Sequence, residues 1–369
     1  MTTQVNHENN NLEILKILLV GDKHVGLTTF TKKICSGIYD QSTIETIGVN
    51  FSLKPPLNNN SVGYQLWQIA SGIQNKFDSI NPYYFVGSNG SILMFDVTNR
   101  ESFQHIEYYI ESILMYNQTF IPFAILGNKI DLRKKKLDSV TDKEAAEYCV
   151  KLLERFGRFN CKIKYFPIST LEDENFDECF TYLSESFIEF RDSLPKILLG
   201  GDKDSADRAF FRKYIIQNEF NIQDTIIKTI PYQESEIGIE FTSINPSRKY
   251  FIEQRIPFYK NAQGAIFIFN VTSRESFKNV DKYVKEFLQY NELETVVLVI
   301  LGNDISKRID DPNSIADQEA ETYCLQVQNE TKRTGLKIQY IPISIETNLN
   351  VEKCFTFLAK TCANITRKE

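Results

Sequence analysis

The sequence contains no apolar run close to the roughly 18 residues that a membrane-spanning helix needs, so no transmembrane segment is predicted. It also lacks an excess of basic residues. The 42 Lys and Arg residues face 48 Asp and Glu residues, and the net charge of −6 argues against a globally basic nucleic-acid binder. The seven cysteines form no CxxC pair or other metal-ligand spacing, and their odd number disfavours a disulfide framework. Together these absences favour a reduced, cytoplasmic protein.

A long internal repeat is the main feature that the sequence does have. Each of five motifs occurs twice, in the same order: Lys16–Lys23 and Lys196–Lys203, Phe95–Phe103 and Phe269–Phe277, Leu126–Asp131 and Leu301–Ser306, Glu144–Cys149 and Glu319–Cys324, Lys162–Ser169 and Lys337–Ser344. A repeat of this length indicates a duplicated domain and not a solenoid. We therefore predict a disordered polar tail over residues 1–11, one domain over residues 12–193 and a second over residues 194–369.

Each copy alternates short apolar runs with helix-like stretches. In the first copy, the runs expected as strands are Ile14–Val20, Ser91–Val97, Phe123–Leu126 and Ile163–Ile168. The expected helices are Ser102–Tyr116, Asp142–Phe156 and Asn175–Phe190. This alternation predicts two α/β domains, each with a mostly parallel sheet and helices on both faces. The second copy is shorter in its first half, and the loop Pro55–Asn60 is the expected place of the difference.

The segment Gly21–Thr28 lies between the first predicted strand and a predicted helix. A strand, a turn bounded by glycines and a helix start form a cradle of backbone N–H groups that binds anions. The phosphate-binding pattern is GxxxxGK[ST], and the segment fits it at Gly21, Gly26 and Thr28 but has Leu27 in place of the lysine. Lys23 and Val25 lie within the same loop.

Five motifs, beginning with this loop, follow in the order and spacing of a small GTPase. The first copy therefore resembles the Ras superfamily, and most of all its Rab branch; the second copy resembles it more weakly. The resemblance implies a P-loop fold and a site for GTP or GDP with Mg²⁺. It implies Thr28 and Thr46 as Mg²⁺ ligands and Tyr39 as the aromatic residue that packs on guanine. The implied guanine-reading residues are Asn128, Lys129, Asp131, Ser169 and Thr170.

Several positions depart from the family pattern. Leu27 cannot donate to phosphates, and the loss of one charge-assisted hydrogen bond costs about 1.5–3 kcal/mol. Gln68 stands where the family has a Mg²⁺-organising aspartate. Ser71 replaces a glycine that contacts the γ-phosphate, and Gly72 replaces the glutamine that positions the attacking water. Phosphoryl transfer depends on such positioning and charge stabilisation, so we expect little or no GTP hydrolysis. A minority hypothesis is that Lys23 bends towards the phosphates and replaces the missing charge.

The second copy departs further. Asp207 takes the place of the lysine, and with Asp202 and Asp204 it brings negative charge to the phosphate position. Ser306 replaces the guanine-reading carboxylate. No cofactor is therefore expected in the second domain. Asn303 persists where its neighbours changed, which also allows a structural role for Asn128, namely holding neighbouring loops together.

These observations predict a pseudo-GTPase that acts as a protein-interaction or regulatory module. By the resemblance, partners would dock on the switch regions and adjoining strands, where the candidate contacts are Ile47, Val49, Phe51 and Trp67. For Trp67, packing in the core is the alternative. Trafficking or signalling partners follow from the resemblance alone, and the lack of a prenylation cysteine at the C-terminus predicts no lipid anchor. The alternative function is a slow switch in which the first domain binds GTP or GDP and the second is a scaffold.

Overall fold

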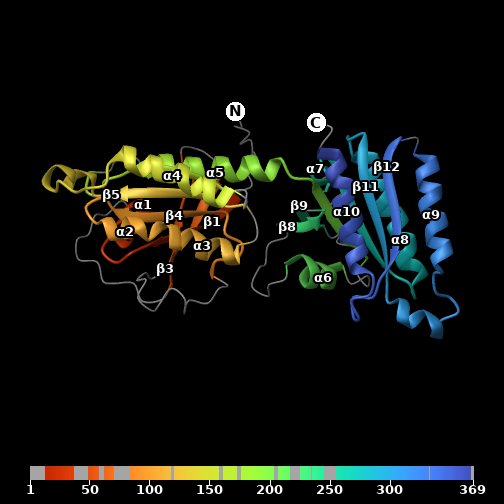
Figure 1. Cartoon of the computed structure of the whole chain (residues 1–369). Helices are drawn as coiled ribbons and strands as arrows, with labels where there is room; N and C mark the ends of the chain where they lie inside the picture. Colours follow the sequence, from red (N-terminus) through yellow and green to blue (C-terminus); the bar gives the residue numbers. More distant parts are fainter. Residues whose placement is uncertain are drawn as a thin grey trace, which may run out of the picture. The chain divides into compact units, whose positions relative to one another are not determined.

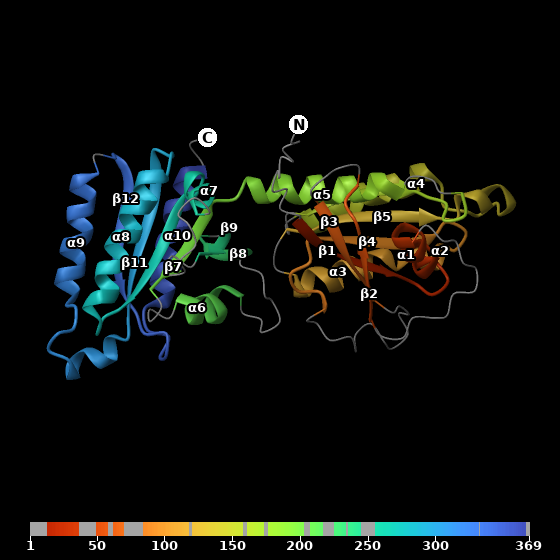
Figure 2. The same cartoon turned by 180° about the vertical axis from the view of Figure 1, so that it is seen from behind.

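A computed structural model describes residues 13–36, 49–57, 62–69, 84–117, 120–157, 161–172, 176–202, 207–216, 225–233, 235–244, 255–331 and 333–366. The chain divides into two compact units, residues 1–190 and residues 191–369. Each unit has one six-stranded sheet flanked by helices (Figures 1 and 2). None of the described helices is long and apolar enough to cross a membrane.

The sheet of the first unit has the strand order β2-β3-β1-β4-β5-β6. Only β2 runs antiparallel to its neighbour, and the other strand pairs are parallel. This confirms the predicted mostly parallel sheet. The strands are β1 (Glu13–Gly21), β2 (Val49–Lys54), β3 (Val62–Ile69), β4 (Gly90–Asp96), β5 (Pro122–Asn128) and β6 (Lys162–Pro167).

Helices of the first unit cover both faces of this sheet. Side chains of α3 and α4 share one buried cluster with Leu18 and Val20 of β1. On α1, Phe30 lies instead against Phe180 of α5, with ring centroids 6.3 Å apart. The alternation of side chains along a strand accounts for these two layers. The helices are α1 (Leu27–Ser36), α2 (Arg100–Gln104), α3 (Ile106–Tyr116), α4 (Asp142–Phe156) and α5 (Phe176–Asp192), with a 3₁₀ helix over Ile130–Lys135.

The helix expected over Ser102–Tyr116 is two helices, α2 and α3, which meet at His105. Local caps fix where α2 and α4 begin. The side chain of Asn99 accepts a hydrogen bond from the Glu101 N–H before α2. Thr141 accepts one from the Glu144 N–H before α4. Such caps satisfy N–H groups that have no partner within the helix.

The second unit repeats this topology, with strand order β12-β11-β10-β7-β9-β8 and only β8 antiparallel to its neighbour. Its strands are β7 (Lys196–Gly201), β8 (Thr225–Tyr232), β9 (Ser235–Ser243), β10 (Gly264–Asn270), β11 (Thr295–Asn303) and β12 (Gly335–Pro342). The helices are α6 (Asp207–Phe210), continued by a π-helical stretch over Phe211–Ile216, α7 (Ile256–Lys260), α8 (Arg274–Tyr290), α9 (Asp317–Glu330) and α10 (Val351–Thr366), with a 3₁₀ helix over Ile305–Asp310.

Two buried clusters lie on opposite faces of the second sheet. Ile197 and Leu199 join the cluster that includes α10, whereas Leu198 joins the cluster that includes α8 and α9. The first two antiparallel strands are connected by residues 233–234 here, and by residues 55–61 in the first unit. The shortening of the second copy therefore includes this connection, as the sequence predicted.

Candidate functional site

The predicted phosphate loop connects β1 to α1, and its backbone requires glycine at two positions. A Cβ atom at Gly21 would collide with the carbonyl oxygen of Met94 on β4. Gly26 has φ of +105°, and a Cβ there would collide with the side-chain amide of Asn128. Between them, Val25 is buried and Lys23 is exposed. The loop is thus seated tightly against the neighbouring strand ends.

The residue in place of the phosphate-binding lysine is an apolar side chain that lies inside the fold. Leu27 is only 5% exposed, and its carbonyl oxygen accepts a hydrogen bond from the Thr31 hydroxyl at 2.9 Å. A buried leucine can neither neutralise nor donate to a phosphate. The proposed replacement of this charge by Lys23 stays a prediction.

Thr28 and Gln68 lie together at the end of the loop. The Gln68 side chain is 3% exposed, and its Nε2 donates to the Thr28 hydroxyl at 2.9 Å. The family places a Mg²⁺-organising aspartate at position 68, but the Gln68 amide is neutral in either orientation. Mg²⁺ prefers oxygen ligands that include carboxylates, so this pair does not fit the ion.

The loop also holds one carboxylate, Asp22, which is engaged elsewhere. One of its oxygens lies 2.7 Å from Nδ1 of His105, and the other accepts from the Tyr109 hydroxyl at 2.5 Å. Burial and this neighbouring carboxylate raise the pKa of Tyr109. These contacts anchor the phosphate loop to the start of α3. In the part of the chain that the structure describes, no group of three or more acidic, His or Cys side chains could hold a metal ion.

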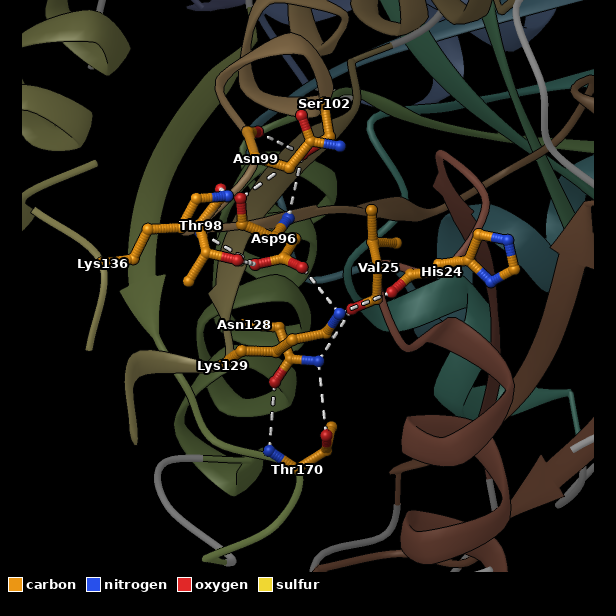
Figure 3. Close-up of polar contacts among 10 residues, drawn as sticks. All are labelled: His24, Val25, Asp96, Thr98, Asn99, Ser102, Asn128, Lys129, Lys136 and Thr170. Carbon is orange, nitrogen blue, oxygen red and sulfur yellow. Dashed lines mark hydrogen bonds and ion pairs between the residues drawn. The ribbon is translucent and has the colours of Figure 1, made fainter. Parts of the chain in front are cut away.

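The opposite end of the site is built around Asn128, the last residue of β5 (Figure 3). This fully buried side chain donates through Nδ2 to the Val25 carbonyl at 2.8 Å and to the Thr170 hydroxyl at 3.3 Å. Its Oδ1 accepts the Thr170 N–H at 3.1 Å. One amide therefore ties the phosphate loop to the loop after β6, which supports the structural role expected for it.

Lys129 extends this network on the other side of the loop. Its backbone is left-handed, with φ of 68°, and its Nζ donates to the His24 carbonyl at 2.8 Å and to Asp96 at 2.6 Å (Figure 3). The other carboxylate oxygen of Asp96 accepts from the N–H and the hydroxyl of Thr98, both at 2.8 Å. The lysine is thereby held over the loop by a paired carboxylate.

Asp131 and Ser169, two predicted base-reading residues, also meet. The Ser169 hydroxyl donates to the Asp131 carboxylate at 2.8 Å. Lys33 was not predicted as a site residue; it is 9% exposed and donates to the Thr170 carbonyl at 2.8 Å. Lys213 makes the same bond to the Ile345 carbonyl in the second unit, at 2.6 Å. The repeat itself carried this signal, since both lysines follow their loops at the same distance.

Other predicted site residues fall outside the described residues. These are Tyr39, Thr46, Ile47, Ser71 and Gly72. The structure therefore brings together the predicted residues of the phosphate loop and of the loops predicted to contact the base. The roles expected for the five residues outside the described part stay predictions.

Three aromatic residues of the first unit form a group on and beside the sheet edge, here called the aromatic cluster: Phe51, Trp67 and Tyr84. The Phe51 ring is 51% exposed and packs edge-on against Trp67, with centroids 4.6 Å apart. The ring centroid of Tyr84 lies 6.0 Å from that of Trp67. Trp67 is partly buried against the core and also contacts the exposed Phe51, so its packing role is observed and its contact with a partner stays a prediction. Val49, at the start of β2, is half-buried.

A lysine that the sequence analysis did not single out lies beneath this cluster. Lys16 Nζ lies 3.9 Å from the centroid of the Trp67 ring and donates to the Val86 carbonyl at 2.8 Å. Burial lowers the pKa of Lys16 to about 8. The cation and the ring attract each other through the ring quadrupole.

The corresponding site of the second unit keeps part of this scaffold with other side chains in it. Asn303 still accepts the Ile345 N–H at 3.0 Å, but its Nδ2 donates to the adjacent Asp304. Asp304 replaces the loop-binding lysine and pairs with Lys307 at 2.9 Å. Asp207 is 8% exposed, and its burial raises the pKa of this carboxyl group.

Comparison with known proteins agrees with this geometry. The model of the Ras family matches the chain twice, over residues 16–189 and 197–364. The chain is 28% identical over 176 residues to Ras-related protein Rab-13 of Canis lupus familiaris, covering 47% of this chain and 80% of Rab-13. It is 30% identical over 177 residues to GTP-binding protein YPT1 of Saccharomyces cerevisiae, covering 48% of this chain and 80% of YPT1. Against Ras-related protein Rab-19 of Bos taurus it is 30% identical over 183 residues, covering 49% and 78%.

Proposed function

The chain belongs to the Ras family, and from that premise we propose that it is a tandem Rab-like pseudo-GTPase, a protein-interaction module with little or no GTP hydrolysis. The observation that carries this proposal is the pair of substitutions at the phosphate end. Leu27 is buried where a lysine would contact phosphates, and Gln68 is bonded to Thr28 where a carboxylate would organise Mg²⁺. Hydrolysis requires charge stabilisation of the transferred phosphoryl group, which neither side chain supplies.

The aromatic cluster is the surface that we propose for partners in the first unit. Aromatic side chains that are partly exposed and rigidly packed are the residues that most often dominate binding energy at interfaces. Phe51 is half exposed and held edge-on by Trp67, so it can contribute apolar area without losing much conformational freedom. We expect protein partners of a trafficking or signalling kind in the cytoplasm, because the relatives are Rab proteins.

The experiment uses the full chain and two alanine variants that remove rings of similar exposure. Phe51→Ala changes the aromatic cluster, whereas Phe258→Ala removes an aromatic ring that is 47% exposed in the second unit. Proteins cross-linked to the wild-type chain in cells are identified by quantitative mass spectrometry. We expect Phe51→Ala to lose partners that Phe258→Ala retains. Equal recovery with both variants would refute this surface.

A second candidate function is supported by the base-reading end of the site. Asn128, Asp131 and Thr170 hold the positions that the family uses for guanine, with their loops tied together by hydrogen bonds as short as 2.8 Å. On this reading the first unit binds GTP or GDP and the second, without a nucleotide, acts as scaffold. The name of one relative, GTP-binding protein YPT1, agrees with that reading.

Calorimetric titration with GDP tests this second function. The Asp131→Ala variant removes the base-reading carboxylate, and Ser306→Ala makes the matched change at the equivalent position of the second unit. We expect GDP binding by the wild-type chain and by Ser306→Ala, and its loss in Asp131→Ala. Absence of binding by the wild-type chain would refute the second function and leave the interaction module.

A further inference from the structure

The two ends of the site in the first unit differ in how well they fit a nucleotide bound with Mg²⁺. At the base end, buried Asn128 and the Asp131–Ser169 pair are preorganised by hydrogen bonds within the protein. At the phosphate end, the side chains that meet are a hydroxyl and a neutral amide, Thr28 and Gln68. A preorganised site loses less conformational entropy on binding, so the base end is the part suited to hold a ligand.

Among the residues that the structure describes, the donor set at the phosphate end does not suit a divalent cation. Mg²⁺ in phosphate-loop proteins is held by a Ser or Thr hydroxyl together with an aspartate and phosphate oxygens. Here the Thr28 hydroxyl receives an N–H from Gln68, whose side chain carries no negative charge in either orientation of the amide. A neutral amide also supplies no net charge to offset the free energy that is needed to remove part of the ion's hydration shell.

Two described carboxylates, one in the loop and one at the end of β4, are held by other groups. Asp22 lies in the loop, but one of its oxygens contacts Tyr109 of α3 and the other contacts His105, the residue before α3. Asp96 at the end of β4 is paired with Lys129 and accepts two bonds from Thr98. Recruiting either carboxylate to a metal ion would break these contacts.

We infer that the first unit binds its guanine nucleotide without a requirement for Mg²⁺. The inference rests on the second candidate function, namely that a guanine nucleotide binds there at all. Coupling between two ligands is reciprocal, so a protein that does not hold Mg²⁺ beside the nucleotide gains no nucleotide affinity from the ion. Binding then depends on the contacts to the base and on the backbone N–H groups of the loop.

The test is calorimetric titration of the full-length chain with GDP, once with excess MgCl₂ and once with EDTA. Coupling between two ligand sites typically changes affinity about 5- to 150-fold, so we expect the two dissociation constants to differ by less than about fivefold. A larger loss of affinity in EDTA would overturn the inference while leaving nucleotide binding intact. No binding in either buffer would overturn both the inference and the second candidate function.

Two variants of β3 identify the cause. Gln68→Asp restores a carboxylate beside Thr28, and we expect it to make GDP binding more than about fivefold tighter in MgCl₂ than in EDTA. Gln65→Asp adds the same charge to the same strand on its other face, because the two positions are an odd number of residues apart, and should stay insensitive to the metal. Equal responses of the two variants would refute the role assigned to Gln68. Circular dichroism confirms that each variant is folded before it is titrated.

Discussion

Replacing Asn128 by alanine should destabilise the first unit more than the matched Asn303→Ala change destabilises the second. Both asparagines end the strand next to the last strand of their sheet, and each accepts the N–H of a residue that follows that last strand, Thr170 or Ile345. They differ in what the amide nitrogen contacts. Asn128 donates to the buried Val25 carbonyl in the phosphate loop, whereas Asn303 donates to the partly exposed carboxylate of Asp304.

This difference in the partner of the amide nitrogen determines how much free energy of unfolding each variant is expected to lose. A buried polar group left without a partner costs about 1–3 kcal/mol, whereas an exposed group can bond to water instead. Asn128→Ala leaves two buried groups unpaired, the Val25 carbonyl and the Thr170 N–H, so the cost is about 2–6 kcal/mol. Asn303→Ala leaves one buried N–H, so the cost is about 1–3 kcal/mol. The larger value approaches the whole free energy of unfolding of a small domain.

Native-state hydrogen exchange, read by mass spectrometry, measures both units in the same molecule, which suits a two-domain chain that need not unfold in one step. In Asn128→Ala, we expect loss of protection over residues 161–172 and the phosphate loop, with the second unit unchanged. In Asn303→Ala, we expect a smaller loss confined to the loop around Ile345. Equal protection of the two variants would refute the reasoning, as would a loss of less than about 0.5 kcal/mol in Asn128→Ala, which is the range of an ordinary surface change.

Further predictions concern the aromatic cluster and the phosphate loop. Trp67 is the single tryptophan, and its fluorescence should titrate with a midpoint near pH 8 that disappears in Lys16→Met; a midpoint above about 10, the ordinary lysine range, would contradict the contact. Because the folded-state pKa of Lys16 lies below its unfolded value, the unfolded chain binds more protons between these two values, and stability should rise as the pH increases from about 8 to 10.5. Gly26→Ala should lower the free energy of unfolding by at least about 1–3 kcal/mol because φ there is +105°; urea unfolding that matches the wild type would contradict the described loop.

The fold could be predicted from the sequence because its signals are local and occur twice. Short apolar runs buried on both faces, helix-like stretches between them and a repeated set of motifs are enough to indicate two α/β domains. The start and end of α4 agree with the expected Asp142–Phe156, where the Thr141 cap and an amphipathic pattern coincide. The break between α2 and α3 was not predicted for two reasons. No glycine or proline marks it in the sequence, and His105 keeps helical dihedral angles.

The candidate site could be predicted only in part. The residues predicted to contact the base could be named from the sequence because their motif is contiguous, but their partners come from distant positions. Lys33 reaches the Thr170 carbonyl, and Gln68 reaches Thr28, across strands whose order no local pattern reveals. The apparent role of Asn128 as a ligand-contacting residue is also incomplete, because its amide is occupied in holding two loops together.

The most direct test of the central claim is single-turnover release of inorganic phosphate from GTP by the full-length chain in MgCl₂, with Asp131→Ala as the matched control. If the first unit is a pseudo-GTPase, phosphate release by the wild-type chain equals that of Asp131→Ala and of a protein-free control. The account would be contradicted by phosphate release that exceeds both controls and disappears in Asp131→Ala, since that activity would come from the site in which Leu27 and Gln68 replace the catalytic charges.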